Sequence, residues 1–304
     1  MYVSLTLFRT ERWFNEDIMP VIDLATIADE KGIDLLNLPE HVVMGKDISA
    51  YPYTPGLFTA ETGFYEPMVF HGAVAMRTKR MRLTTGVLLA PLRPAVLLAK
   101  QIATLDVLSG GRVELGLGVG WQKVEYDYEG LAWEGRFGRM METIEACRLL
   151  WTRAPASYHG KHIDFEGAYS RPFPLQAGGP PILLGVAPTP RNIERMVKSA
   201  DGWCPLGLTL DEVAAGMDNI RAGLVAAGRD PADFRLRLPA PTVMTAGKPD
   251  LDATLSGLPG LKALGCTEVN MSPLPFCTGP GDYESFVDKV VAARNAVGSL
   301  LFDA

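Results

Sequence analysis

The chain has few cysteines, and they are dispersed. Only four occur among 304 residues, and no two have the Cys-x-x-Cys spacing of zinc sites or redox motifs. This argues against a disulfide framework or a cysteine-based metal site. We expect the cysteines to be buried small hydrophobic residues in a reducing compartment. They are Cys147, Cys204, Cys266 and Cys277.

Histidine is scarce as well, with four in the chain. His159 and His162 are three residues apart, but no predicted helix aligns them and no cysteine cluster lies nearby. We therefore expect no metal site at this pair. His71 lies within a predicted helix and is interpreted as a residue of its face.

Positive charge and long apolar runs are also missing. Lys and Arg total 29 against 35 Asp and Glu, and the basic residues are scattered. The net charge of −6 gives no electrostatic footprint for nucleic acid or an anionic membrane. No uninterrupted apolar run approaches the roughly 18 residues of a membrane span, and the N-terminus reads as a strand rather than a leader. We expect a cytoplasmic protein without nucleic-acid or membrane partners.

What the chain does contain is a repeated strand–helix pattern, shown most clearly by residues 81–121. The first strand of this segment is too apolar for a one-sided sheet, and the helix after it ends at a Gly-Gly pair. The second strand runs into Gly118 and Gly120, with Trp121 directly after them. Glycines at the carboxyl end of a parallel strand let a ligand approach the backbone. Close strand–helix packing is the alternative explanation for both glycines.

Eight such units can be counted. Strands are predicted at 2–8, 33–38, 82–89, 113–117, 182–185, 202–205, 235–244 and 268–271. Helices are predicted at 18–31, 67–77, 94–108, 137–151, 190–200, 210–227, 251–263 and 283–297. This is the α/β pattern of a (β/α)8 TIM barrel, here in a single domain over residues 1–304. A doubly wound sheet is the alternative, but it would have about two fewer units and glycines after its first strand.

Two segments are longer than ordinary connections in such a barrel. Residues 42–66, after the second strand, are polar and aromatic without helical period, which favours a long loop over the barrel mouth. Residues 154–181, before the fifth strand, contain short extended pieces and a Pro/Gly-rich return. We interpret the second segment as a small hairpin insertion.

Candidate functional residues lie where strands end. Glu40 and His41 place a carboxylate and an imidazole at the barrel mouth, where they can donate or accept a proton near neutral pH. A histidine packed against backbone is the alternative. Thr189 is placed to cap a helix that starts at Pro190, so residues 185–189 would face its N-terminal amides. Phosphate binds at such helix ends, although an ordinary capped helix explains the same spacing.

Several motifs in this order resemble the luciferase-like monooxygenase superfamily. They are Pro39-Glu40-His41, Leu105-Asp106-x-Leu-Ser-Gly-Gly-Arg112, Leu115-Gly-x-Gly-x-Gly-Trp121, Pro181-Ile-Leu-Leu-Gly185 and Ala200-Asp-Gly-Trp203. The resemblance runs from the first strand to about residue 206. It is strongest to the branch predicted to use the deazaflavin coenzyme F-420.

The resemblance implies a TIM barrel, commonly a homodimer, that binds a flavin or deazaflavin at its carboxyl end. Glu40 and His41 would lie beside the reactive ring. Gly86 and Val87 would form a bulge in the third strand, often with a non-prolyl cis peptide. Residues 185–189 would receive the cofactor phosphate. The implied cofactor-binding set is Gly86, Val87, Gly118, Gly120, Gly185, Val186, Ala187 and Thr189.

The chain departs from family patterns at two positions. Val186 stands where members often have a second glycine, which makes a close phosphate approach there harder. Trp121 stands where relatives that oxidise sugar phosphates have a carboxylate, which argues against such substrates. An apolar or aromatic substrate is expected instead, in a pocket formed by Trp121, Tyr51, Tyr53 and Phe58.

The sequence thus predicts an oxidoreductase that transfers hydride between coenzyme F-420 and a small organic molecule, with His41 handling the proton. One alternative is an FMN-dependent two-component monooxygenase that uses molecular oxygen. Such an enzyme would need a separate flavin reductase as partner and a site that excludes water. Another alternative is a non-catalytic flavin-binding barrel, in which the Glu40-His41 pair has no evident use.

Overall fold

The strands form one parallel sheet that curls into a nearly closed barrel. The computed structural model describes residues 1–52, 56 and 58–298. The strand order is β3-β2-β1-β13-β10-β9-β8-β5-β4. The strands are β1 (Tyr2–Thr6), β2 (Leu35–Leu38), β3 (Arg82–Thr85), β4 (Leu88–Leu89), β5 (Leu115–Gly118), β8 (Ile182–Leu184), β9 (Gly202–Trp203), β10 (Arg235–Pro239) and β13 (Glu268–Met271). The barrel closes where Leu83 N donates to Arg112 O at 2.8 Å and Leu83 O accepts from Glu114 N at 2.9 Å.

The third barrel strand is broken in two at Gly86 and Val87. Before the break, β3 pairs with β2; after it, β4 pairs with β5. The peptide bond between Gly86 and Val87 is cis. The bulge implied by the family resemblance is therefore present, and it explains why nine strands take the place of the eight predicted.

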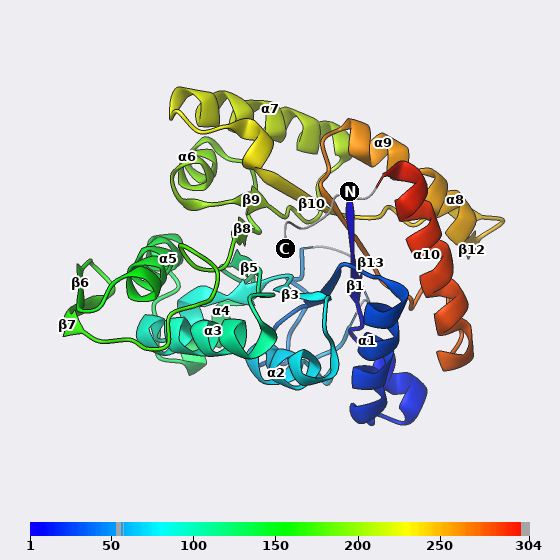
Figure 1. Cartoon of the computed structure of the whole chain (residues 1–304), viewed down its shortest axis with the longest axis horizontal. Helices are drawn as coiled ribbons and strands as arrows, with labels where there is room; N and C mark the ends of the chain where they lie inside the picture. Colours follow the sequence, from blue (N-terminus) through cyan, green and yellow to red (C-terminus); the bar gives the residue numbers. More distant parts are fainter. Residues whose placement is uncertain (53–55, 57, 299–304) are drawn as a thin grey trace.

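Helices surround the strands, as Figure 1 shows, and each predicted helix is present. They are α1 (Met19–Lys31), α2 (Pro67–Arg77), α3 (Ala95–Ser109), α5 (Arg136–Thr152), α6 (Pro190–Ser199), α7 (Leu210–Ala226), α8 (Leu251–Ser256), α9 (Leu258–Ala263) and α10 (Tyr283–Val297). Gly257 separates α8 from α9. Thr209 and Glu212 form a reciprocal capping box at the start of α7. The short helix α4 (Lys123–Tyr128), directly after β5, was not predicted.

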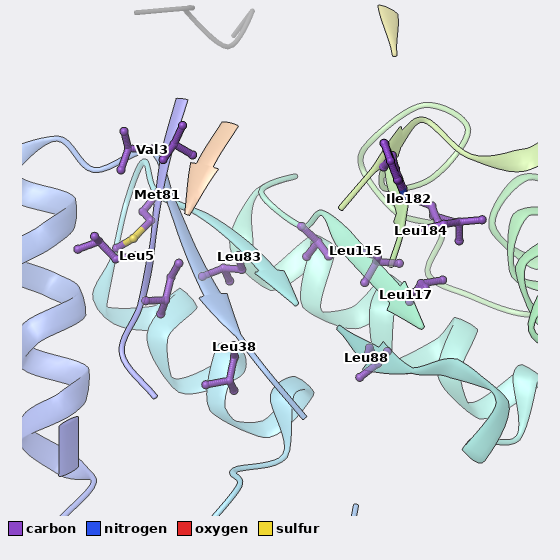
Figure 2. Close-up of a cluster of buried hydrophobic side chains, with 14 of the residues drawn as sticks. Val3, Leu5, Leu38, Met81, Leu83, Leu88, Leu115, Leu117, Ile182 and Leu184 are labelled. Atoms are coloured by element: carbon purple, nitrogen blue, oxygen red, sulfur yellow. The ribbon is translucent and has the colours of Figure 1, made fainter. Parts of the chain in front are cut away.

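The core lies between the strands and the helices. Figure 2 shows buried side chains of the strands and their flanks, among them Val3, Leu5, Leu38, Leu83, Leu88, Leu115, Leu117, Ile182 and Leu184. They belong to one cluster with apolar residues of the helices, including Val21 and Ala25 of α1 and Leu98 and Ile102 of α3. The four cysteines are buried and free, as expected of small hydrophobic residues. None of the helices in the described part of the chain is long and apolar enough to cross a membrane.

Several predicted strands extend beyond the observed ones, by the most at the strand predicted at 235–244. The strand predicted at 235–244 ends at Pro239, because Pro239 and Pro241 have no N–H to donate to a ladder. Beyond it, β11 (Met244–Thr245) pairs antiparallel with β12 (Lys248–Pro249) in an exposed hairpin. The strand predicted at 2–8 ends at Thr6, and a 3-10 helix, η1 (Thr10–Phe14), follows it.

The predicted hairpin insertion is confirmed. Strands β6 (Ala156–His159) and β7 (Asp164–Ala168) pair antiparallel within the segment 154–181. Figure 1 shows this hairpin projecting from the left side of the barrel. His159 contacts Asp164 and Glu166 across the hairpin and is exposed. No group of three or more metal-ligating side chains occurs among the residues whose structure is described.

Candidate active site

A cavity of about 730 Å³ opens at the carboxyl ends of the barrel strands. Its wall contains most of the predicted site residues: Glu40, His41, Tyr51, Phe58, Gly86, Val87, Gly118, Gly120, Trp121, Gly185, Val186 and Ala187. Tyr53 lies outside the described residues. Thr189 is not part of the cavity wall. The cavity wall thus combines residues at and after the ends of β2, β5 and β8 with Gly86 and Val87, which lie between β3 and β4.

His41 is held between two residues that follow β5. Its Nδ1 lies 3.1 Å from Glu125 Oε2, and its Nε2 lies 3.1 Å from Trp121 Nε1. Because an indole N–H can only donate, Nε2 is the acceptor of that bond, and Nδ1 then carries the proton and donates to Glu125. Glu125 is fully buried and also accepts a hydrogen bond from Val42 N at 3.0 Å. Gln122 Nε2 also lies 3.3 Å from Nδ1, and together these contacts hold the His41 ring in one orientation.

Glu40 has different partners from its neighbour in the sequence. Its buried carboxylate pairs with the guanidinium of Arg93 and accepts a hydrogen bond from Leu89 N at 2.7 Å. Burial raises the pKa of the Glu40 carboxyl, although the Arg93 charge opposes the shift. Arg93 also donates to Glu66 at 2.8 Å, so one guanidinium joins both ends of the 42–66 segment. Glu40 therefore ties the long loop to the barrel, and the carboxylate that faces His41 is Glu125.

Val87 forms the floor of the cavity, and glycines make room for it. A Cβ on Gly118 would lie 2.5 Å from Val87 Cγ2, and a Cβ on Gly185 would lie 2.5 Å from Val87 Cγ1. A Cβ on Gly86 would lie 2.4 Å from Asn37 Oδ1. Each distance is far below van der Waals contact, so larger residues at these positions would displace the floor.

Aromatic side chains form the wall above His41. Tyr51 packs on Phe58 at 4.6 Å between ring centroids and on Trp121 at 5.3 Å. The ring of His41 lies 4.8 Å from that of Phe64, which stacks on Phe8. Tyr51, Phe58 and Trp121, which were predicted to form a substrate pocket, thus lie together in the cavity wall, and Phe8 and Phe64 extend this aromatic surface. This wall shields His41 from solvent.

The N-terminus of α6 is capped as predicted. Thr189 Oγ1 accepts a hydrogen bond from Asn192 N at 3.3 Å, and Asn192 Nδ2 donates to Ala187 O at 2.9 Å. Only the residues before the cap, Gly185 to Ala187, reach the cavity wall. Thr189 thus shapes the helix end from outside the cavity.

Residues 3–263 match the model of the luciferase-like monooxygenase family. This chain belongs to that family. Its members are oxidoreductases, so we assign the luciferase-like chain to the enzymes rather than to the non-catalytic flavin-binding barrels. The (β/α)8 barrel predicted from the sequence is the fold of this family.

Three known proteins show how this luciferase-like enzyme compares. The Mycobacterium tuberculosis protein Rv0953c is 35% identical over 236 residues, which cover 76% of this chain and 80% of that protein. The FMNH2-dependent dimethylsulfone monooxygenase of Pseudomonas putida is 32% identical over 178 residues, covering 56% of this chain and 48% of the enzyme. The coenzyme F-420-dependent tetrahydromethanopterin reductase of Methanopyrus kandleri has a similar fold, with a TM-score of 0.73, 17% identity and coverage of 95% and 96% of the two chains.

The polar groups of the cavity fit a flavin-type cofactor. Asn37 Oδ1 is buried and accepts no hydrogen bond from the described part of the chain, while Asn37 Nδ2 donates to Thr6 Oγ1 at 2.9 Å. Arg136 lies in the wall with its guanidinium 3.5 Å from the centre of the Trp133 ring, and its Nε is buried and likewise unpaired within the described residues. In a flavin or deazaflavin that carries a phosphate, the polar edge of the ring would bind Asn37 Oδ1 and the phosphate would bind Arg136. Neither Asn37 nor Arg136 was predicted, because no motif marks them.

Proposed function

We propose that this enzyme transfers hydride between coenzyme F-420 and a small apolar or aromatic organic molecule. The observation that carries the proposal is the fixed orientation of the His41 ring, whose Nε2 faces Trp121 in the cavity wall while Nδ1 faces Glu125. Hydride transfer at a carbon that bears oxygen is accompanied by proton transfer at the oxygen. A dehydrogenase or reductase therefore needs a group that exchanges a proton beside the reacting atoms.

Each part of the cavity has a separate task in this proposal. A bound deazaflavin supplies or accepts the hydride. Val87 and the glycines around it would hold the ring of this cofactor, and Arg136 with residues 185–187 would bind its phosphate. The aromatic wall of Tyr51, Phe58 and Trp121 orients an apolar substrate and excludes water.

His41 moves the proton at Nε2. Glu125 stabilises the imidazolium that forms, because its carboxylate remains against Nδ1 in both protonation states. Nε2 cannot accept from Trp121 and carry a proton at the same time, so Trp121 releases this nitrogen when the proton arrives. Proton transfer at His41 is thereby coupled to the loss of its hydrogen bond with Trp121, a residue of the aromatic wall that orients the substrate.

The test is a titration of the purified protein with F-420 and, separately, with FMN, followed by absorption and fluorescence. We expect saturable binding of F-420, weaker binding of FMN, and anaerobic reduction or oxidation of bound F-420 by a substrate from a panel of alcohols, aldehydes and enones. Binding of FMN alone, with turnover that requires oxygen, would overturn the F-420 assignment.

FMN-dependent monooxygenation is the second candidate. The observation that favours it is the 32% identity to the FMNH2-dependent dimethylsulfone monooxygenase over 178 residues. In this case a separate flavin reductase would deliver reduced FMN, and the closed aromatic wall would protect the reaction from water. Oxygen uptake that depends on both an added reductase and an organic substrate would identify this function.

A further inference from the structure

Arg237 is a buried cation that reaches across the interior of the barrel to the break in the third strand. It lies on β10 and is only 4% exposed. Its Nη1 donates to Thr85 O at 3.0 Å, and its Nη2 donates to Thr84 Oγ1 at 2.7 Å. Thr85 directly precedes Gly86. The guanidinium therefore lies beneath the residues that form the cavity floor.

A second, small cavity of about 50 Å³ separates Arg237 from that floor. Gly86, Val87 and Asn37 line both this cavity and the large one, whereas Arg237 lines only the small one. The volume is enough for one or two water molecules among polar neighbours that include Asn270. The Gly86–Val87 segment, with Asn37, Leu206 and Asn270, thus lies between a buried positive charge and the large cavity.

Arg237 belongs to a cluster of charged side chains within the barrel. Arg237 pairs with Glu114 and, at 2.8 Å from Nε to Oε1, with Glu268; Arg235 also pairs with Glu114. Burial opposes ionisation of Glu114, but the charges of Arg237 and Arg235 outweigh it and keep its pKa below the ordinary value. Burial raises the pKa of Glu268; the Arg237 charge opposes this shift, and the nearby Glu114 charge adds to it. Of these four charged side chains, Arg237 is the one that lines the small cavity beneath Gly86 and Val87.

We propose that the buried charge of Arg237 sets the reduction potential of the cofactor by stabilising its reduced, anionic form above Gly86 and Val87. The inference rests on the proposed function, since it needs a redox-active ring on that floor. Hydride transfer brings two electrons and one proton to the oxidised ring, which gains one negative charge unless it takes a further proton from solvent. A fixed cation beneath the ring lowers the free energy of this anion, and so favours the reduced form.

The test compares reduction potentials of bound F-420 and bound FMN, measured spectrophotometrically in wild type and variants at one pH. Arg237→Met is expected to make the potential more negative and to raise the pKa of the reduced cofactor. The ratio of the affinities for reduced and oxidised cofactor should fall about tenfold, as expected for a unit charge about 10 Å away at an effective dielectric constant of about 20. Glu114→Gln, which removes a negative charge from the same cluster, should shift the potential in the opposite direction.

Arg235→Met is the matched control. It takes the same charge from the same carboxylate, but Arg235 lines neither cavity, so its effect on the potential should be smaller. A folded, cofactor-binding Arg237→Met variant with the wild-type potential would overturn the inference and leave the proposed function intact. If that variant does not fold, Glu114→Gln decides, and the absence of a positive shift overturns the inference. A wild type that binds neither cofactor would overturn the proposed function and this inference with it.

Discussion

Glu125 Oε2 lies 3.1 Å from His41 Nδ1, although the two residues are 84 positions apart in the sequence. His41 follows β2 and Glu125 lies in α4, and the parallel sheet brings their strand ends to the same edge of the barrel. The other oxygen of the Glu125 carboxylate binds Val42 N at 3.0 Å. One buried carboxylate thus fixes both the ring of His41 and the backbone beside it.

Replacement of His41 or Glu125 should impair turnover without loss of cofactor binding. We expect His41→Gln to lower kcat about 100-fold or more, because the site loses its proton-transfer group. Glu125→Gln should lower kcat about tenfold to 100-fold, since the amide still accepts from Val42 N but no longer stabilises the imidazolium. Steady-state kinetics and cofactor titrations measure both effects.

The double variant separates a shared role from two independent ones. If Glu125 acts through His41, the double variant should be no slower than His41→Gln alone. Unchanged turnover in His41→Gln would remove His41 from the mechanism. Additive losses would show that Glu125 has a task of its own.

The sequence was sufficient to predict the barrel, because hydrophobic strands and helices alternate in a regular order. It also indicated which strand ends meet at the large cavity, since Glu40, His41, Gly118 and Trp121 lie at or shortly after the ends of β2 and β5 and line its wall. The family resemblance predicted the bulge at Gly86 and Val87. These features depend on local pattern and on the rule that parallel strands gather their carboxyl ends at one edge.

Side-chain partners were harder to predict, because tertiary packing chooses them. Glu40 is next to His41 in the sequence, but its carboxylate is bound by Leu89 N of β4 and by the guanidinium of Arg93, four residues further along the chain. Glu125 lies in a helix of six residues, which is too short for a periodic signal. Asn37 and Arg237 point into the barrel from strands whose pattern reveals burial but not the neighbour across the interior.

Arg136 and Thr189 should have separable effects on cofactor binding and stability. Arg136→Met removes a cation from the cavity wall and is expected to weaken binding of a phosphate-bearing cofactor about tenfold or more. Thr189→Ala removes a helix cap that lies outside the wall, so it should cost about 1 kcal/mol of stability and change cofactor affinity little. Isothermal titration and urea unfolding measure the two quantities. If Thr189→Ala weakened cofactor binding more than Arg136→Met, then Thr189 and not Arg136 would be the residue that contributes to binding.

A homodimer is implied by the family resemblance, and we expect it to form through the outer faces of α2 and α3. These adjacent helices expose apolar side chains that include Val69 at 74%, Met76 at 71% and Leu108 at 54%. Met76→Glu should convert a dimer into a monomer in light scattering after gel filtration. Val225→Glu, which alters a comparably exposed residue on α7, is the control and should leave the mass unchanged. A monomeric wild type would contradict the prediction.

His71 should make the protein less stable as the pH falls from about 6.5 to about 4. Burial lowers the pKa of this imidazole from 6.5 to about 4, although a hydrogen bond to Thr84 O at 2.9 Å opposes the shift. Its Nδ1 is buried and has no hydrogen-bond partner among the described residues, so a proton there would have no acceptor. Below pH 6.5, His71 takes up a proton in the unfolded chain but stays unprotonated in the folded chain until the pH approaches 4. This difference favours unfolding by up to about 3 kcal/mol at pH 4.

Urea unfolding of wild type and His71→Gln across this pH range isolates the effect. The glutamine amide can still donate to Thr84 O but does not titrate, so the stability of the variant should lack this component of the pH dependence. The difference in free energy of unfolding between wild type and variant should therefore shrink as the pH falls, and most of the change should occur between pH 6.5 and 4. A difference that stays constant over this interval would show that His71 takes up its proton equally in the folded and unfolded chain, and that its burial imposes no cost on charging.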